Sequence, residues 1–252
     1  MSEQAAAFGC DVTQGTLLGG RVRFAQAAKG YRAAIDPVLL AASVTAPRGG
    51  RAAELGCGAG AALLCLAARR PDLRLLGIEI DATSAELARA NVAANGRSER
   101  IEIVLGDAFR PPRSLEATFE AVFVNPPYLT DAIAEPPPDR GKRRATVGAP
   151  DDLDAWVASA MALLRPKATL IMIYRADRLD ELLAALAGRA GEIVVFPLWP
   201  KEGEAARRVI VRARKGLRSP LRLAAGLVLH RSDGSYTETA ERILRQGEAL
   251  VL

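Results

Sequence analysis

The chain has 252 residues, of which 50% are hydrophobic and 25% charged, a composition that suits a globular α/β domain with a large core. No stretch of about 18 apolar residues is free of charge and proline, and residues 1–9 lack the basic start of a secretory signal, so we expect no membrane span and a cytoplasmic location. A net charge of +5 is compatible with an anionic partner, whereas three cysteines without zinc spacing and a single histidine, His230, exclude a zinc site and a histidine-based triad.

We expect residues 1–50 to form a short N-terminal cap that ends in a helix over 36–46, with Asp36 as its N-cap and Pro37 in its first turn. From 51 to 252, β-rich runs alternate with helical ones. The expected strands are 52–55, 73–80, 101–105, 121–124, 169–174, 193–196 and 208–211. The expected helices are 61–69, 84–94, 153–164 and 178–186. This alternation predicts a mostly parallel sheet with helices on both faces.

A glycine loop, Glu54-Leu-Gly-Cys-Gly-Ala-Gly60, joins the first of these strands to its helix. Without Cβ atoms, Gly56, Gly58 and Gly60 let the backbone turn sharply and touch a ligand, and the helix start offers free N–H groups. The spacing is G-x-G-x-G instead of the G-x-G-x-x-G of dinucleotide enzymes, and no Lys-Ser/Thr pair follows as in a P-loop. The alternative is an ordinary tight turn, in which Cys57 is a small buried residue.

Two carboxylates follow the next two strands. Glu79 ends the strand over 73–80 and can accept hydrogen bonds from both hydroxyls of a ribose, in NAD as well as in S-adenosylmethionine. Its neighbour Asp81 is expected to cap the following helix. Asp107, in Leu-Gly-Asp-Ala-Phe, can accept from an adenine amino group while the Ala108 N–H meets the ring, although an aspartate in a Gly-Asp turn also has local uses.

The segment Asn125-Pro-Pro-Tyr128 follows the apolar strand over 121–124 and is expected to be a rigid turn, because both prolines fix φ. It offers two acceptors, the Asn125 side-chain oxygen and the Pro126 carbonyl, and the aromatic face of Tyr128. These groups suit an NH₂ whose lone pair is delocalised into a ring or carbonyl. Two accepted hydrogen bonds draw that nitrogen toward sp³, so that it can attack a sulfonium methyl without a strong base.

The glycine loop, Glu79, Asp107 and the Asn-Pro-Pro-Tyr motif resemble the amino-methyltransferase branch of the class I fold. Gln26-Ala-Ala-Lys-Gly-Tyr-Arg32 and Ile35-Asp-Pro-Val-Leu-Leu-Ala41 are similar to one family, the bacterial tRNA adenine-N6 methyltransferases that act on an anticodon-loop adenine of a valine tRNA. The resemblance runs from about Gly19 to the end of the chain. It departs at Arg144–Gly148, where the family often carries a His-Glu pair.

The resemblance implies a Rossmann-like class I methyltransferase with a seven-stranded, mostly parallel sheet whose last strand is antiparallel. It implies S-adenosylmethionine as cofactor, no metal, and RNA, most simply a tRNA, as partner. The residues expected at the cofactor are Glu54, Gly56, Cys57, Gly58, Gly60, Glu79, Ile80, Asp107, Ala108 and Asn125. The residues expected to be catalytic are Asn125, Pro126 and Tyr128. A lid is expected from Gln26, Arg32 and Asp36.

Two basic clusters flank the Asn-Pro-Pro-Tyr segment in the sequence, at Arg140–Arg144 and Lys201–Arg222. We expect them to contact RNA phosphates, with Arg143 and Arg144 nearest the site, although a solvated basic surface would have the same composition. Three other functions stay open: methylation of a release-factor glutamine, methylation of guanine N2 in RNA, and a cofactor-binding module without activity. An NAD dehydrogenase fits least, because no proton-transfer residue is evident. The sequence leaves the oligomeric state open.

Overall fold

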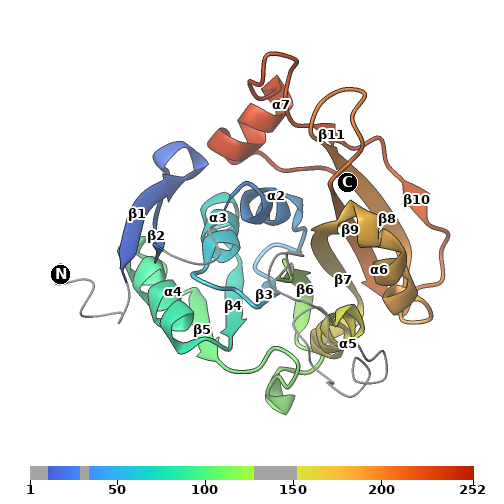
Figure 1. Ribbon diagram of the computed structural model, residues 1–252. Helices are drawn as coiled ribbons and strands as arrows, with labels where there is room; N and C mark the ends of the chain where they lie inside the picture. Colours follow the sequence, from blue (N-terminus) through green and yellow to red (C-terminus); the bar gives the residue numbers. More distant parts are fainter. Residues whose placement is uncertain (1–10, 29–33, 128–151) are drawn as a thin grey trace, which may run out of the picture.

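The computed structural model describes residues 11–28, 34–127 and 152–252, which fold around one large mixed sheet (Figure 1). The strand order is β10-β8-β9-β7-β6-β3-β4-β5, and β11 pairs with β8. The strands are β3 (Arg51–Leu55), β4 (Arg74–Glu79), β5 (Ile101–Leu105), β6 (Phe119–Val124), β7 (Leu164–Arg175), β8 (Ala190–Trp199), β9 (Arg208–Lys215), β10 (Arg222–Leu223) and β11 (Leu227–Val228). Only β9 is antiparallel to its neighbours, β7 and β8.

The expected class of fold is confirmed, but the strand count is not. The sheet has nine strands among the described residues instead of seven, because β10 and β11 add two short parallel pairings to β8. Each has two residues, too few for a periodic pattern to reveal. The antiparallel strand is confirmed as β9, although it lies inside the sheet between β7 and β8.

Helices cover both faces of the sheet (Figure 1). One face packs against α2 (Asp36–Ser43), α3 (Ala61–Arg69) and α4 (Ala82–Ala94), and the other against α5 (Leu153–Leu163) and α6 (Leu179–Leu186). Alternate residues along each strand face the two cores: Phe123 of β6 belongs to the first, and Val122 and Val124 to the second. Both faces are therefore apolar, as a buried parallel sheet requires.

Helix α2 begins at Asp36, with Ile35 and not Asp36 at the N-cap, and Pro37 lies in its first turn. The expectation for Asp36 was therefore wrong: its carboxylate instead meets the Arg208 guanidinium, Oδ2 to Nε at 3.2 Å. The helix ends at Ser43, where Arg69 donates to the carbonyls of Ala41 and Val44 at 2.9 and 2.5 Å. A cation at this end complements the helix dipole.

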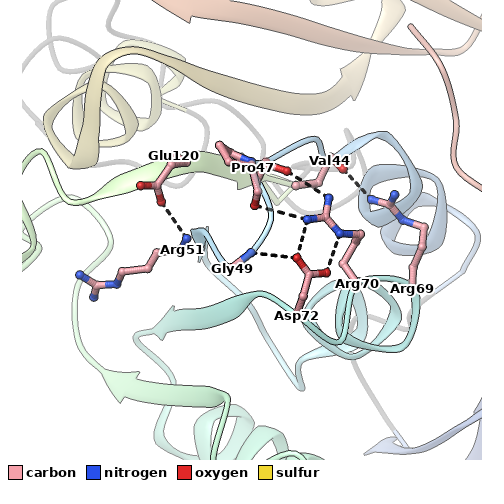
Figure 2. Close-up of polar contacts among 9 residues, drawn as sticks. Val44, Pro47, Gly49, Arg51, Arg69, Arg70, Asp72 and Glu120 are labelled. Atoms are coloured by element: carbon pink, nitrogen blue, oxygen red, sulfur yellow. Dashed lines mark hydrogen bonds and ion pairs between the residues drawn. The ribbon is translucent and has the colours of Figure 1, made fainter.

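A second arginine, Arg70, helps to connect the segments that precede β3 and β4 (Figure 2). Arg70 forms two hydrogen bonds with the Asp72 carboxylate, both at 2.8 Å, and the same carboxylate accepts from the Gly49 N–H at 3.0 Å. The Arg70 guanidinium holds the pKa of the Asp72 carboxyl well below its usual range. This contact joins the loop before β3 to the turn before β4, so the two strands start together.

The end of the chain packs against its beginning. The short helix α7 (Glu238–Glu241) runs into a π-helical turn, Arg242–Gln246, that lies against α2. The backbone N–H of Leu250 donates to the carbonyl of Ala42 at 2.9 Å, and Arg21 donates to the carbonyl of Gln246. These contacts enclose α2 between the sheet and the C-terminal tail.

Residues before α2 form a hairpin that the sequence pattern did not predict. Strands β1 (Val12–Leu17) and β2 (Val22–Ala27) pair antiparallel, separate from the main sheet. Asn91 on α4 pairs with the backbone of Ala25: its Oδ1 accepts from the N–H and its Nδ2 donates to the carbonyl, both at 2.8 Å. The side-chain amide thus acts as a neighbouring strand would, and it fixes β2 beside α4.

Candidate functional site

A cavity of about 1290 Å³ opens where β3, β4, β5 and β6 end. Each strand brings at least one expected residue to it: Gly56 after β3, Glu79 at the end of β4, Asp107 after β5 and Asn125 after β6. Strand order reverses between β3 and β6, because β4 and β5 lie on one side of β3 and β6 lies on the other. Ligands of open α/β sheets bind at such a reversal.

The glycine loop is hydrogen-bonded to β4, and the Trp156 ring packs closely against it. The N–H groups of Gly56 and Cys57 both donate to the carbonyl of Ile78, at 2.8 and 3.1 Å. Gly56 has φ +68°, and a Cβ there would lie 2.9 Å from the Trp156 ring. Gly58 has φ +53°, and a Cβ there would meet no atom within 4 Å, so it would project into open space at the cavity. The loop leaves room for a ligand at Gly58.

Glu79 is buried and holds the loop as well as facing the cavity. Its Oε2 accepts from the Gly58 N–H at 2.7 Å and its Oε1 from the Asp81 N–H at 2.9 Å. A carboxylate has about four acceptor positions. Two therefore remain for a diol such as a ribose. Asp81 caps α4 as expected, with Oδ1 accepting from the Ser84 N–H at 2.8 Å.

Glu54 lies deeper, only 3% exposed, and accepts from the Leu63 N–H in the first turn of α3 at 3.2 Å. Desolvation by burial raises the pKa of the Glu54 carboxyl well above its usual value, and the nearby Glu79 charge adds to this effect, against the hydrogen bond from Leu63. Two buried carboxylates on one cavity wall favour a ligand that carries positive charge there.

The loop after β5 forms an apolar wall with one polar edge. Asp107 Oδ1 accepts from the Phe109 N–H at 2.8 Å, and the Ala108 carbonyl accepts from the Ser159 hydroxyl of α5. Phe109 meets the Trp156 ring edge to face, with centroids 4.9 Å apart. Ile80, which also lines the cavity, is 70% exposed. A planar aromatic ring would cover it.

Asn125, Pro126 and Pro127 follow β6 and line the same cavity. Leu55 and Val124 are direct partners in the β3–β6 ladder, so Gly56 and Asn125 leave the sheet side by side. Tyr128, the last residue of the motif, lies outside the described residues. Asn125 and Pro126 therefore line the same cavity as Gly56, Gly58 and Glu79.

The N-terminal hairpin covers part of this space. Phe24, Gln26 and Ala27 of β2 line the cavity, together with Pro37. Gln26 thus lies in the cavity wall, and its role in a lid stays a prediction. Arg32 lies outside the described residues. Asp36 is not among the lining residues, because it pairs with Arg208.

The model of the Methyltransferase small domain family matches residues 34–173, more than half of the chain. The chain belongs to the Methyltransferase small domain family. This match includes Gly56, Gly58, Glu79, Asp107 and Asn125, all of which line the cavity. The family match and the cavity therefore share these residues.

Curated relatives of this family member carry a narrower name. A "tRNA1(Val) (adenine(37)-N6)-methyltransferase" of Porphyromonas gingivalis is 37% identical over 134 residues, which cover 51% of this chain and 51% of the relative. The match thus spans about half the length of that protein. A protein of the same name from Aeromonas hydrophila is 28% identical over 206 residues, covering 81% of this chain and 84% of the relative.

The fold also matches a solved structure of a methyltransferase. A predicted O-methyltransferase from Agrobacterium tumefaciens superposes with a TM-score of 0.72 and 27% identity, over 86% of this chain and 99% of that one. Fold and family together indicate S-adenosylmethionine as the cofactor of this chain. The residues fit it: Gly58 leaves open space, Glu79 keeps acceptor positions for a diol, and Ile80 offers an exposed apolar surface.

Gly60 has a structural role at the start of α3. It is the N-cap of α3 with φ +85°, and it is not among the cavity-lining residues. Cys57 and Cys65 are buried, which agrees with their interpretation as small apolar residues. Burial, with the Glu54 charge, raises the pKa of the Cys65 thiol to about 12.

The second basic cluster does not form one surface. Because β9 is antiparallel, its start at Arg208 lies beside the end of β7, whereas its last residues, Arg214 and Lys215, lie near the opposite edge of the sheet. Lys215 donates to the carbonyls of Met161 and Leu164 at 2.6 and 2.7 Å, and Arg214 pairs with Glu192. The first cluster, with Arg143 and Arg144, lies outside the described residues.

Sequence reasoning missed part of the wall. Trp156 and Ser159 come from α5, Phe24 from β2, and Arg110 and Arg113 from the loop after β5. In the sequence, Trp156 and Ser159 are simply members of an apolar helix face, which gives no signal for a cavity. Among the described residues no group of three or more His, Cys, Asp or Glu side chains could hold a metal ion, and no helix is long and apolar enough to cross a membrane.

Proposed function

We propose that this chain transfers a methyl group from S-adenosylmethionine to the exocyclic N6 amine of an adenine in structured RNA, a tRNA. The observation that carries the proposal is the position of Asn125 and Pro126, in register beside the glycine loop and lining the same cavity as Glu79 and Asp107. Relatives named as tRNA adenine-N6 methyltransferases support the choice of substrate.

The chain's own groups would act by position. Glu54, Glu79, Ile80, Asp107 and Ala108, with the glycine loop, hold the cofactor, which supplies an electrophilic methyl group. The Asn125 side-chain oxygen and the Pro126 carbonyl each accept one hydrogen bond from the substrate amine. Two acceptors concentrate the lone pair on nitrogen and aim it at the cofactor, so the leaving proton needs only water.

The substrate base must leave the RNA stack to reach this cavity. We assign the aromatic face of Tyr128 to stacking on the extruded adenine, with Gln26 and Arg32 belonging to the lid beside it. Arg143 and Arg144 would contact the flanking phosphates. A tRNA substrate would place the reaction in the cytoplasm.

The decisive experiment offers the enzyme two substrates. Purified protein is incubated with labelled S-adenosylmethionine and either total tRNA or a purified release factor, and the tRNA is digested to nucleosides. We expect label in tRNA as N6-methyladenosine, and none with Asn125→Ala. Label only in the release factor would replace the proposal with glutamine methylation, and label recovered as N2-methylguanosine would replace the target base.

A further inference from the structure

A row of arginines crosses the sheet at the edge opposite the cavity. Arg51 is the first residue of β3 and is the direct ladder partner of Arg74, the first residue of β4. Arg100 precedes β5, and its carbonyl accepts from the Leu75 N–H at 2.8 Å. The next ladder pair is Leu75 with Ile101, so Arg100 follows Arg74 in the same row. Neighbouring strands are about 4.8 Å apart.

These arginines line a groove of about 690 Å³, separate from the methyltransferase cavity. Arg74 and Arg100 are exposed, and the Arg51 guanidinium lies 4.9 Å from the centre of the Phe119 ring. Figure 2 shows the Arg51 side chain extending away from the Arg70–Asp72 contact. Glu99 and Glu102 also line the groove.

The guanidinium groups of this row form no ion pair within the described part of the chain. Among those residues, no carboxylate forms an ion pair with Arg51, Arg74 or Arg100, whereas Arg89 in the same groove pairs with Glu86 at 2.5 Å. Like charges directly opposite each other in a sheet destabilise it. An anion in the groove would offset the repulsion between neighbouring guanidinium groups.

The groove and the cavity lie at the two ends of β5, which is the edge strand of this half of the sheet. On the cavity side, Arg113, in the segment between β5 and β6, is exposed and lines the cavity. Five residues of extended chain separate the two ends, about 17 Å. A polyanion that follows the β5 edge can therefore contact Arg113 and the arginine row at once.

We propose that the groove lined by Arg51, Arg74 and Arg100 binds backbone phosphates of the RNA substrate at a distance from the methylated base. This proposal rests on the proposed function for its partner. Guanidinium groups suit phosphates because each presents several donors in a planar fork. Three guanidinium groups in a row across adjacent β-strands suit successive phosphates of one RNA strand better than they suit a single small anion.

A contact of this kind distinguishes a whole tRNA from its loop. An isolated anticodon stem-loop of valine tRNA would fill the cavity but would lack most of the backbone that reaches the groove. Full-length valine tRNA would engage both. The wild-type enzyme should therefore bind the full-length RNA more tightly, and that preference should depend on the arginine row.

The test compares the triple variant Arg51→Gln, Arg74→Gln, Arg100→Gln with a charge-matched control. The control is Arg189→Gln, Arg242→Gln, Arg245→Gln, whose members form surface ion pairs with Asp154, Glu238 and Glu241. Affinities for both RNAs are measured between 50 and 200 mM salt. We expect the groove variant to bind full-length tRNA about tenfold more weakly or worse, with a shallower salt dependence. Stem-loop and S-adenosylmethionine affinities should match the control.

Equal binding of full-length tRNA by the two triple variants would overturn the proposal that the groove binds phosphates. So would an equal loss for the stem-loop or for S-adenosylmethionine, because the effect would then come from the cavity or from the fold. If the wild type binds and methylates tRNA while the groove variant behaves as the control, the groove proposal is wrong and the proposed function stands. A wild type that neither binds nor methylates tRNA ends the proposed function, and this inference with it.

Discussion

Glu79 Oε2 accepts a hydrogen bond from the Gly58 N–H at 2.7 Å, although 21 positions separate the two residues. The carboxylate proposed to hold the cofactor therefore also fixes the loop that surrounds it. Its other oxygen accepts from the Asp81 N–H, which connects the same group to the start of α4. A single side chain thus joins the glycine loop to the turn between β4 and α4.

This shared role makes Glu79→Gln informative. An amide supplies one acceptor oxygen, so one of the two N–H groups would face an NH₂ group, and a neutral side chain binds hydroxyls less well. We expect S-adenosylmethionine affinity to fall by about 1.5–3 kcal/mol, the range of hydrogen bonds to charged groups. Calorimetry measures this directly. Glu86→Gln, on the exposed side of α4, should bind as the wild type does, and unaltered binding by Glu79→Gln would refute the role.

Gly58 and Gly96 form a matched pair of positions. Their φ values are +53° and +62°, and a Cβ at either would meet no atom within 4 Å, but only Gly58 lines the cavity. Alanine should lower the free energy of unfolding by about 1–2 kcal/mol at both, because an L-residue is strained there. Only Gly58→Ala should also weaken cofactor binding. Chemical denaturation and calorimetry separate the two effects, and a Gly58→Ala protein with normal affinity would place the cofactor elsewhere.

Asn125→Ala should abolish turnover while S-adenosylmethionine binds nearly as before. The Asn125 oxygen matters most when the substrate nitrogen pyramidalises, so its loss should appear in kcat. Single-turnover rates with tRNA, alongside cofactor titration, provide the measurement. If kcat stays at the wild-type value, Asn125 does not act on the substrate amine.

Glu54 predicts a pH dependence of stability. Its pKa is raised in the folded protein, so between the ordinary glutamate value of about 4.3 and that raised pKa the folded state holds a proton that the unfolded chain has lost. Its contribution therefore falls as pH rises through this window. Glu54→Gln lacks this term, and its stability relative to the wild type should increase from pH 4 upward. Urea unfolding of the ligand-free proteins at several pH values tests it; a difference independent of pH would contradict it.

What the sequence could predict was local. The glycine loop, Glu79 and Asp81 have their partners within one strand-helix-strand unit and the turn that follows it, and the pattern indicated each of these residues. The pairing of Asn91 with Ala25 joins residues 66 positions apart, so the local sequence around either residue does not predict it. The hairpin that covers the cavity was missed for this reason.

The basic residues illustrate the opposite error. Arg208 and Lys215 are close in sequence, but an extended strand carries them to opposite edges of the sheet. Arg51, Arg74 and Arg100 are far apart in sequence, yet successive parallel strands begin beside one another. Charge runs along the chain are a poor guide to charged surfaces in a parallel sheet.

The packing of α2 under the C-terminal tail bears on biosynthesis. The ribosome releases α2 early, but the residues around Leu250 that cover it emerge only after the whole sheet has been made. During translation, the apolar residues on that side of α2 stay exposed to solvent and to chaperones. A protease that trims the tail, or a tag fused close to it, would therefore act on a helix near the other end of the sequence.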